Sequence, residues 1–308
     1  MKQSFTLSTL IMQLFNKNSI KKTAILSICS SMLFLSVQTK AQDIDYISKR
    51  SALSLQLGTN SFLGDLGGNS GKGKPFIKDF NLKSANLFTG LSYTYFFDKG
   101  FSINGDIHFT SVSGADSLSD QTPGQSLGRY QRNLSFKSSV YEMQITGELY
   151  PLQAVSMYSI PKLMPYIGTG IGFFHFNPKT KLNGEWYYLQ PLHLEGQGFA
   201  EYPERSNYKL TQLYLPISLG VKYRIDENSL ISINAIFRHT FTDYIDDAST
   251  TYINPALFDK YLSPYASSIA KQLYYRGKGS PTPKTVNYRG YAGNDSYTSV
   301  FLSFTHLF

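Results

Sequence analysis

The sequence predicts an all-β fold, an eight-stranded antiparallel β-barrel that crosses a membrane. Three observations predict it: segments in which apolar and polar residues alternate, connections that are alternately short and long, and an aromatic residue at the end of the last segment. The composition agrees, because 15% of the residues are aromatic and only 16% are charged, whereas soluble chains have about a quarter charged.

The first 41 residues have the features of an export signal. They contain five lysines and no acidic residue, and an uncharged stretch runs from Thr23 to Val37. Thr39 and Ala41 place small residues where a signal peptide is cut, so we expect cleavage between Ala41 and Gln42. The stretch is short and rich in serine for a bilayer-spanning helix. An uncleaved membrane anchor is the alternative.

This interpretation divides the chain into a signal peptide, 1–41, and one barrel domain, 42–308. The single cysteine, Cys29, lies in the leader, so the mature chain needs no disulfide. The net charge of +8 also comes largely from the leader, because the rest of the chain holds 24 basic and 21 acidic residues. Such a balance argues against a nucleic-acid-binding protein.

The segments that we predict as strands are 51–57, 86–97, 101–113, 133–149, 166–176, 211–225, 229–244 and 297–308. Several contain ten or more residues. A tilted strand needs about 9–11 residues to cross a bilayer, whereas strands of soluble proteins average about 5–6. The lengths therefore favour strands that cross a membrane.

Within these segments every second residue is apolar, and charged residues stand in the middle of the polar face. A soluble barrel would turn its apolar face inward, whereas a membrane barrel turns it to the lipid and fills the lumen with polar groups. Six charges are predicted to line the lumen and to neutralise one another: Asp106, Glu142, Glu148, Lys222, Arg224 and Arg238. Gly168, Gly170 and Gly172 would leave room for the long basic side chains. A lumen of this width is filled by its own side chains, which argues against a diffusion pore.

The connections between the segments are sorted by length. Those at 98–100 and 226–228 are tight, and the one at 150–165 is of medium length and contains three prolines. The other connections are long: 58–85, 114–132, 177–210 and 245–296. Outer-membrane barrels have short periplasmic turns and long extracellular loops. We therefore expect an outer-membrane location, with the long loops outside the cell.

The last segment ends in a pattern typical of outer-membrane barrels. Val300, Leu302, Phe304 and the terminal Phe308 lie on one face. A terminal aromatic residue of this kind resembles the assembly signal of bacterial outer-membrane barrels. The alternative, an edge strand that happens to end in phenylalanine, does not account for the sorted connections.

No catalytic or cofactor motif stands out in the sequence. HExxH, GxSxG and P-loop patterns are absent, and the glycines near 168 lie within a predicted strand with no helix after it. Barrel enzymes that deacylate lipid A carry a histidine and a serine two residues apart. His239 is followed by Thr240 and Phe241, so the hydroxyl of Thr240 is one residue away from the histidine and not two. We therefore expect no enzyme and no cofactor, and keep a lipid A-modifying enzyme as the alternative.

Two loop segments have unusual compositions. Residues 186–198 hold the only tryptophan, Trp186, and either cover the barrel mouth or form a contact surface. Asp243, Asp246 and Asp247 lie close together and have the oxygen ligands that Ca²⁺ prefers. The spacing and glycine of an EF-hand are missing, and aspartates also cap turns. A structural loop is therefore favoured over a metal site.

Several sequence segments resemble those of a family of outer-membrane barrels from Bacteroidota that includes the PorG-type component of the type IX secretion system. They are LGTNSFLGDLGG at 57–68, GELYP at 147–151, PYIGTGIGFFHFNP at 165–178, LQPLHLEGQG at 189–198 and RHTFTDYIDD at 238–247. The residues in or beside the family-like loops are Trp186, Glu195, Gln197, Asp243, Asp246 and Asp247.

The resemblance implies a monomeric barrel, held in outer-membrane lipids, that assists or anchors type IX protein export and contacts a periplasmic ring of partner proteins. On the expected topology only the segment 150–165 offers the ring a sizeable apolar surface. Its candidate contact residues are Met157, Tyr158, Ile160 and Leu163. A surface-exposed binding or adhesion barrel that uses the long loops is a further alternative.

Overall fold

The structure is a computed structural model, and it describes residues 50–66, 85–98, 100–118, 125–154, 162–277, 288–290 and 293–308. The chain divides into two compact units, Met1–Asp43 and Ile44–Phe308, and every described residue belongs to the second. The predicted cleavage site at Ala41 and Gln42 lies outside the described residues. So do three of the predicted contact residues, Met157, Tyr158 and Ile160.

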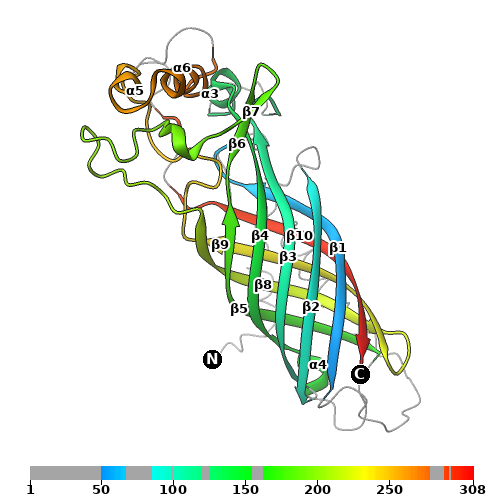
Figure 1. Cartoon of the computed structure of the whole chain (residues 1–308). Coiled ribbons are helices and arrows are strands. Elements are labelled where there is room, and N and C mark those ends of the chain that lie inside the picture. The colour runs from blue at the N-terminus through cyan, green and yellow to red at the C-terminus, as the bar shows by residue number, and fades with distance from the viewer. Residues whose placement is uncertain are drawn as a thin grey trace, which may run out of the picture. The chain divides into compact units, whose positions relative to one another are not determined.

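Within the described residues, eight long strands close into an antiparallel barrel (Figure 1). They are β1 (Ser51–Leu63), β2 (Asn86–Asp98), β3 (Phe101–Ala115), β4 (Ser135–Leu149), β5 (Leu163–Phe176), β8 (Thr211–Arg224), β9 (Ser229–Thr240) and β10 (Ser296–Leu307). Each pairs with the next of these strands along the chain. Pairing of β10 with β1, with Ala52 opposite Leu307, closes the sheet. The predicted fold class is confirmed.

Side chains alternate between the outer wall and the lumen as the sequence predicts. Leu55 and Ile145 on the outer wall are 59% and 64% exposed, whereas the inward-facing Ser54 and Gln144 are 8% and 5% exposed. Because the sheet is closed, its strands leave no edge of unpaired backbone groups, and the apolar wall can face hydrocarbon. This is the architecture of an outer-membrane protein.

The connections separate by length onto the two ends of the barrel (Figure 1). At one end are the tight turns and the short helix α4 (Pro151–Ala154). The other end carries helices and a hairpin: η2 (Asp116–Leu118), α3 (Gln125–Arg132), β6 (Lys179–Leu182), β7 (Glu185–Tyr188), η3 (Gln190–Leu192), α5 (Ala256–Tyr261) and α6 (Pro264–Leu273). We call the described parts of these long connections the cap. None of the described helices is long and apolar enough to cross a membrane.

Three strand boundaries differ from the sequence prediction by three residues or more. The predicted strand 51–57 continues to Leu63, so the first long connection begins later than expected. The predicted strand 229–244 ends at Thr240, whose hydroxyl donates to the main-chain carbonyls of Thr242 and Asp295 and so directs the chain into the cap. Leu163 and Pro165 belong to β5 and not to the preceding connection. A proline is tolerated there because it stands near the start of the strand.

Both ends of the lumen are closed by apolar clusters. At the end with the short turns, Phe96, Tyr150, Met164 and Leu307 belong to one buried cluster. At the other end a larger cluster joins barrel residues to cap residues: Phe62, Val112, Phe174, Phe176, Tyr208, Ile245, Phe258, Leu273 and Tyr297 are among its members. The cap is therefore packed onto the barrel mouth through a common core.

Candidate functional site

The first charged group in the lumen joins Glu142 of β4 to Arg238 of β9. The Nε of Arg238 donates to Oε2 of Glu142 over 2.9 Å, and Nδ1 of His108 lies 3.0 Å from the same oxygen. Arg238 Nη1 also donates to Ser299, whose hydroxyl donates to Asn60. Both charges are buried, so each compensates the other. The sequence placed Arg238 in a lumen network, and the structure identifies Glu142 as its partner.

The second charged group joins Glu148 of β4 to Lys222 of β8. The ammonium group donates to Glu148 over 2.5 Å and to the hydroxyl of Tyr150 over 2.8 Å, and that hydroxyl also donates to Glu148. Lys222 Nζ lies 4.8–5.6 Å from the ring centroids of Phe96, Tyr150 and Tyr166. Aromatic faces attract a cation, so this charge is held by a carboxylate and by three rings.

The remaining two predicted lumen charges do not pair with each other. Asp106 accepts a hydrogen bond from Gln144 over 2.9 Å, and among the described residues no salt bridge includes it. Gln144 accepts in turn from the hydroxyl of Tyr214 over 3.0 Å. Arg224 is the last residue of β8 and is only half-buried. The six charges therefore do not form the single network that we expected. Four of them form two separate ion pairs, and Asp106 is hydrogen-bonded to the uncharged side chain of Gln144.

The glycines of β5 do not make room for basic side chains, contrary to the sequence prediction. A Cβ atom at Gly172 would collide with the ring of Tyr214, and one at Gly170 with the carbonyl oxygen of Ile145. A Cβ at Gly168 would meet Ser218. The space beside these three glycines is therefore already filled, at Gly172 by the ring of Tyr214 and at Gly170 by the backbone of the neighbouring strand.

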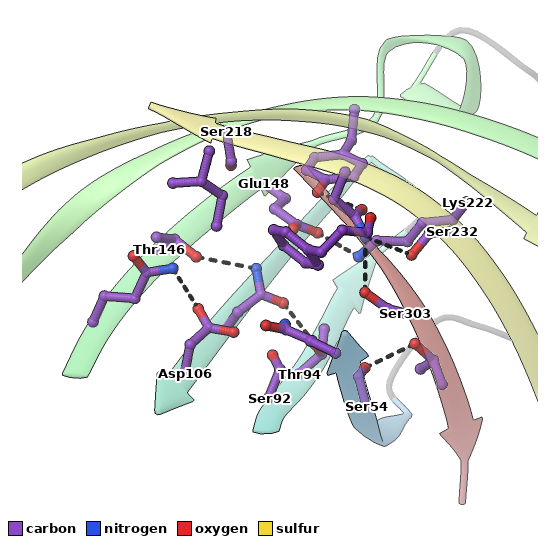
Figure 2. A pocket seen from close by; sticks show the side chains of 18 residues that line it. Ser54, Ser92, Thr94, Asp106, Thr146, Glu148, Ser218, Lys222, Ser232 and Ser303 are labelled. Carbon is purple, nitrogen blue, oxygen red and sulfur yellow. Dashed lines mark hydrogen bonds and ion pairs between the residues drawn. The ribbon is translucent and has the colours of Figure 1, made fainter. Parts of the chain in front are cut away.

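A small polar cavity lies in the lumen, and Figure 2 shows the side chains that line it, among them Asp106, Glu148 and Lys222. Its volume is about 30 Å³. A water molecule needs roughly 10–15 Å³, so the cavity accommodates one or two waters and no larger solute. The lumen is a packed polar core.

In the cap, Glu195 and Asp247 share one cation, Arg289. Glu195 accepts from the amide and hydroxyl of Thr250, over 2.9 and 2.6 Å, and lies 3.4 Å from an Arg289 nitrogen. Asp247 lies 3.0 Å from the other terminal nitrogen of Arg289 and accepts from Tyr208 over 2.7 Å. The loop after β7 is therefore fastened to the loop after β9.

The other two loop aspartates accept hydrogen bonds from the main chain and from a hydroxyl. Asp246 accepts from the amides of Leu66 and Ala248, each over 3.0 Å, and Asp243 accepts from the hydroxyl of Ser249 over 2.7 Å. Among the described residues no three His, Cys, Asp or Glu side chains form a group that suits a metal ion. All three aspartates accept hydrogen bonds from other loop residues.

Burial changes the acidity of these aspartates. It raises the pKa of Asp243 to about 7. It also raises the pKa of Asp247 to about 6, although Arg289 opposes the effect. Burial, reinforced by the charge of Asp65, raises the pKa of Asp246 well above its usual range. The cap therefore contains carboxyl groups that hold protons near neutral pH.

Sequence reasoning missed a buried ion pair that fastens the loop after β3. Arg132 donates to both carboxylate oxygens of Asp116, each over 2.8 Å, and to the main-chain carbonyl of Asp65 over 2.9 Å. These residues stand in a segment without alternation. The one available signal was that arginine and aspartate occur together in a long connection.

The family-like loop 186–198 is partly buried and partly exposed. Glu195 and Gln197 are buried within the cap, whereas Trp186 on β7 is 47% exposed. Leu163, the only predicted partner-contact residue in the described part of the chain, is 52% exposed at the start of β5. It lies on the outer wall, at the end with the short turns.

Two histidines on the outer wall bear on the alternative of a lipid A-modifying enzyme, which requires a histidine beside a hydroxyl. His239 is exposed on the outer wall while Thr240 is fully buried, so their side chains point to opposite faces. His175, however, lies beside a hydroxyl from the next strand, with Nδ1 3.0 Å from Oγ1 of Thr211. The partners are 36 residues apart, which is why no local motif revealed them.

Comparisons with solved structures find proteins that share little sequence with this chain. Ail, the attachment invasion locus protein of Yersinia pestis, is 9% identical, with 85% of this chain and 99% of that chain covered and a TM-score of 0.38. OprG of Pseudomonas aeruginosa is 12% identical, with 86% and 99% covered and a TM-score of 0.34. Outer Membrane Protein W of E. coli is 12% identical, with 84% and 99% covered and a TM-score of 0.32.

No curated protein matches the chain significantly. The model of one family does match, over residues 33–256, which include most of the barrel and part of the cap. The match covers more than half of the chain. The protein is an outer-membrane β-barrel, and it belongs to the family described as Domain of unknown function (DUF6089).

Proposed function

We propose that the protein is a non-enzymatic barrel subunit that anchors or assists the type IX protein export machinery at the outer membrane. The observation that carries the proposal is the filled lumen, in which ion pairs and apolar clusters leave a cavity of only about 30 Å³. A barrel without a passage works through its surfaces. The type IX role comes from the resemblance of the loop and strand sequences.

The contact with a periplasmic partner is assigned to the connection between β4 and β5. Two exposed leucines flank the part of it outside the described residues: Leu152 on α4 is 39% exposed and Leu163 is 52% exposed. A stable interface needs about 800 Å² from each partner, which tight turns do not provide. The sequence between them adds Met157, Tyr158 and Ile160, and we propose that this apolar connection binds the partner.

The test is affinity purification of the tagged protein from detergent-solubilised outer membrane. We expect periplasmic ring proteins to co-purify with the wild type and to be lost when Met157, Tyr158 and Ile160 are replaced by serine. The matched control replaces the exposed cap tyrosines Tyr130 and Tyr265 by serine, which should leave the complex intact. Loss of partners in the control alone would overturn the assigned surface, and absence of export proteins from the wild-type sample would overturn the type IX role.

One observation favours a second candidate, an enzyme that modifies lipid A. His175 and Thr211 form a histidine–hydroxyl pair on the outer wall, where a base next to a hydroxyl resembles an activated nucleophile. The check is to incubate the protein with lipid A and record the mass of the lipid. An acyl chain lost with the wild type and retained with His175→Ala would establish the enzyme. An unchanged mass supports the non-enzymatic proposal.

A further inference from the structure

Three lysines gather on the outer wall at the end that carries the cap. Lys137 of β4 stands directly opposite Lys179 of β6, and Lys181 follows two residues later on the same face. Like charges directly opposite each other destabilise a sheet. Among the described residues no salt bridge includes any of the three lysines. Their mutual repulsion thus calls for an anion from outside the described part of the chain.

Aromatic residues stand beside these lysines. The ring centroid of Trp186 lies 5.2 Å from the ammonium groups of both Lys179 and Lys181, and that of Tyr188 lies 5.8 Å from Lys179. The acidic residue of the hairpin, Glu185, is paired with Leu182. Because side chains alternate along a strand, Glu185 points to the opposite face, where it accepts from Tyr187. The lysine face of the hairpin is therefore purely cationic and aromatic.

The lysine face borders a hollow of about 310 Å³, which we call the basic pocket. Lys137, Lys181 and Trp186 line it, together with Leu118, which is 38% exposed. Arg276 contacts the hydroxyls of two further lining residues, Ser135 and Thr180. The pocket thus has the size of a polar headgroup and is bordered by cations.

Below the basic pocket, a groove of about 740 Å³ crosses the outer wall. Its lower rim is a row of cross-strand neighbours, Leu55, Leu91, Ile107, Met143 and Phe173. Its upper rim is the next outward row, Thr89, Phe109, Tyr141, His175 and Thr211. Adjacent strands lie about 4.8 Å apart, so a row of five strands extends about 19 Å. This is an apolar channel of the dimensions of an acyl chain.

The pocket and the groove share the strands β3 and β4. On β4, Tyr141 at the groove rim stands four positions after Lys137, which at about 3.4 Å per residue is about 14 Å along the strand. In outer-membrane barrels the end with the long loops faces the cell exterior. The lysines therefore stand just above the hydrocarbon of the outer leaflet, at the level of lipid headgroups.

We propose that this wall binds one molecule of the phosphorylated lipid A of lipopolysaccharide, with a phosphate at the three lysines and an acyl chain in the groove. Lysine binds phosphate as a point charge through charge-assisted hydrogen bonds. Lipid A combines phosphate and acyl chains in the outer leaflet, which is the combination that the pocket and groove present. The inference depends on the orientation of the barrel and not on the proposed role in protein export.

The test measures binding of purified lipid A, with its phosphates intact, to the detergent-solubilised protein by native mass spectrometry. We expect one retained lipid and at least tenfold weaker binding by the variant Lys137→Gln/Lys179→Gln/Lys181→Gln. The matched control, Lys209→Gln/Lys260→Gln/Lys271→Gln, removes the same charge from exposed cap positions and should change binding less than twofold. Equal binding by the two variants would mean that the retained lipid is bound non-specifically, and would overturn the proposal.

Two further arms identify the lipid and the groove. Dephosphorylated lipid A and phosphatidylglycerol should each bind at least tenfold more weakly than intact lipid A, and equal binding of either would overturn the assignment to phosphorylated lipid A. Met143→Trp fills the groove and should weaken binding several-fold. Leu219→Trp, at an outward position of β8 that does not line the groove, should not. Equal effects of the two tryptophans would remove the groove from the proposal.

Discussion

Arg238 of β9 and Glu142 of β4 meet 2.9 Å apart inside the lumen, although β5 and β8 separate their strands around the wall. Both side chains are buried, and the guanidinium carbon also lies 5.0 Å from the ring centroid of Tyr297 and 5.5 Å from that of Phe88. The pair thus crosses the lumen and links walls that share no backbone hydrogen bonds.

Replacing Arg238 by methionine should destabilise the barrel by about 3–5 kcal/mol, because Glu142 is left as a buried charge without its partner. Urea unfolding of the protein in lipid vesicles measures the loss. The double variant Arg238→Met/Glu142→Gln should be more stable than the single one. Lys209→Met, at an exposed cap position, is the control and should stay within about 0.5 kcal/mol of the wild type. A loss no larger than that of the control would reject the paired lumen.

The barrel was predictable from the sequence because successive residues of each strand face different surroundings, so the sequence repeats with a period of two residues. Lipid on one face and a packed lumen on the other force alternation, which is visible in β4 from Tyr141 to Leu149. Connection length then fixes the order of the strands, because a tight turn joins only antiparallel neighbours. Even the inward direction of Glu142 and Arg238 follows from this rule.

The pairing of side chains across the lumen was not predictable in the same way. Alternation gives the direction of a side chain but not its height relative to strands on the far wall, so the partner of Arg238 stayed open. The contacts within the cap were even less predictable. Arg289 contacts Glu195, which is 94 residues away, and both stand in loops that have no periodic pattern. Tyr214 beside Gly172 was missed because the sequence shows an empty position but not what fills it.

A lysine at Leu219 should cost about 2–4 kcal/mol, because this outward side chain of β8 is 56% exposed on the wall that faces hydrocarbon. Tyr223→Lys is the matched control, since it stands on the same face of the same strand but at the end with the short turns. There the cost should fall to about 0–1 kcal/mol. Folding of both variants into vesicles of defined thickness gives the comparison. Equal costs would mean that the apolar wall is not in lipid.

The cap should lose stability as the pH rises. Burial raises the pKa of Asp243 to about 7 and that of Asp247 to about 6, from an ordinary 3.8. A carboxyl with a higher pKa in the folded chain takes up a proton on folding in the pH range between its two values. The stabilisation is therefore complete below about pH 4 and disappears as the pH rises through 6 and 7.

Hydrogen exchange of residues 241–277 at pH 5 and pH 8, corrected for intrinsic rates, checks this expectation. Protection should be lower at pH 8. Asp243→Asn should reduce the pH dependence, because the amide does not titrate. Asp226→Asn, in a tight turn at the opposite end of the barrel, should leave it unchanged. Greater protection at pH 8 than at pH 5 would contradict the prediction.

Arg289 should control the order of the cap without controlling the barrel. Its guanidinium lies between Glu195 and Asp247, and all three side chains are buried. Replacing it by methionine leaves two buried carboxylates without a cation, which usually costs about 3–5 kcal/mol. The cost is local, because the loops open while the lumen pairs at Glu142 and Glu148 keep the strands closed.

Limited proteolysis together with gel mobility separates these two effects. Arg289→Met should be cut within 241–277 at least tenfold faster than the wild type, yet its unboiled form should still migrate faster than its boiled form, as a folded barrel does. Arg289→Lys should be intermediate, because lysine keeps the charge but lacks the planar fork that reaches both carboxylates. The control Arg276→Met removes a cation whose described contacts are hydroxyls, so its cleavage rate should change less. A loss of the fast-migrating form in Arg289→Met would mean that the cap and the barrel unfold as one unit.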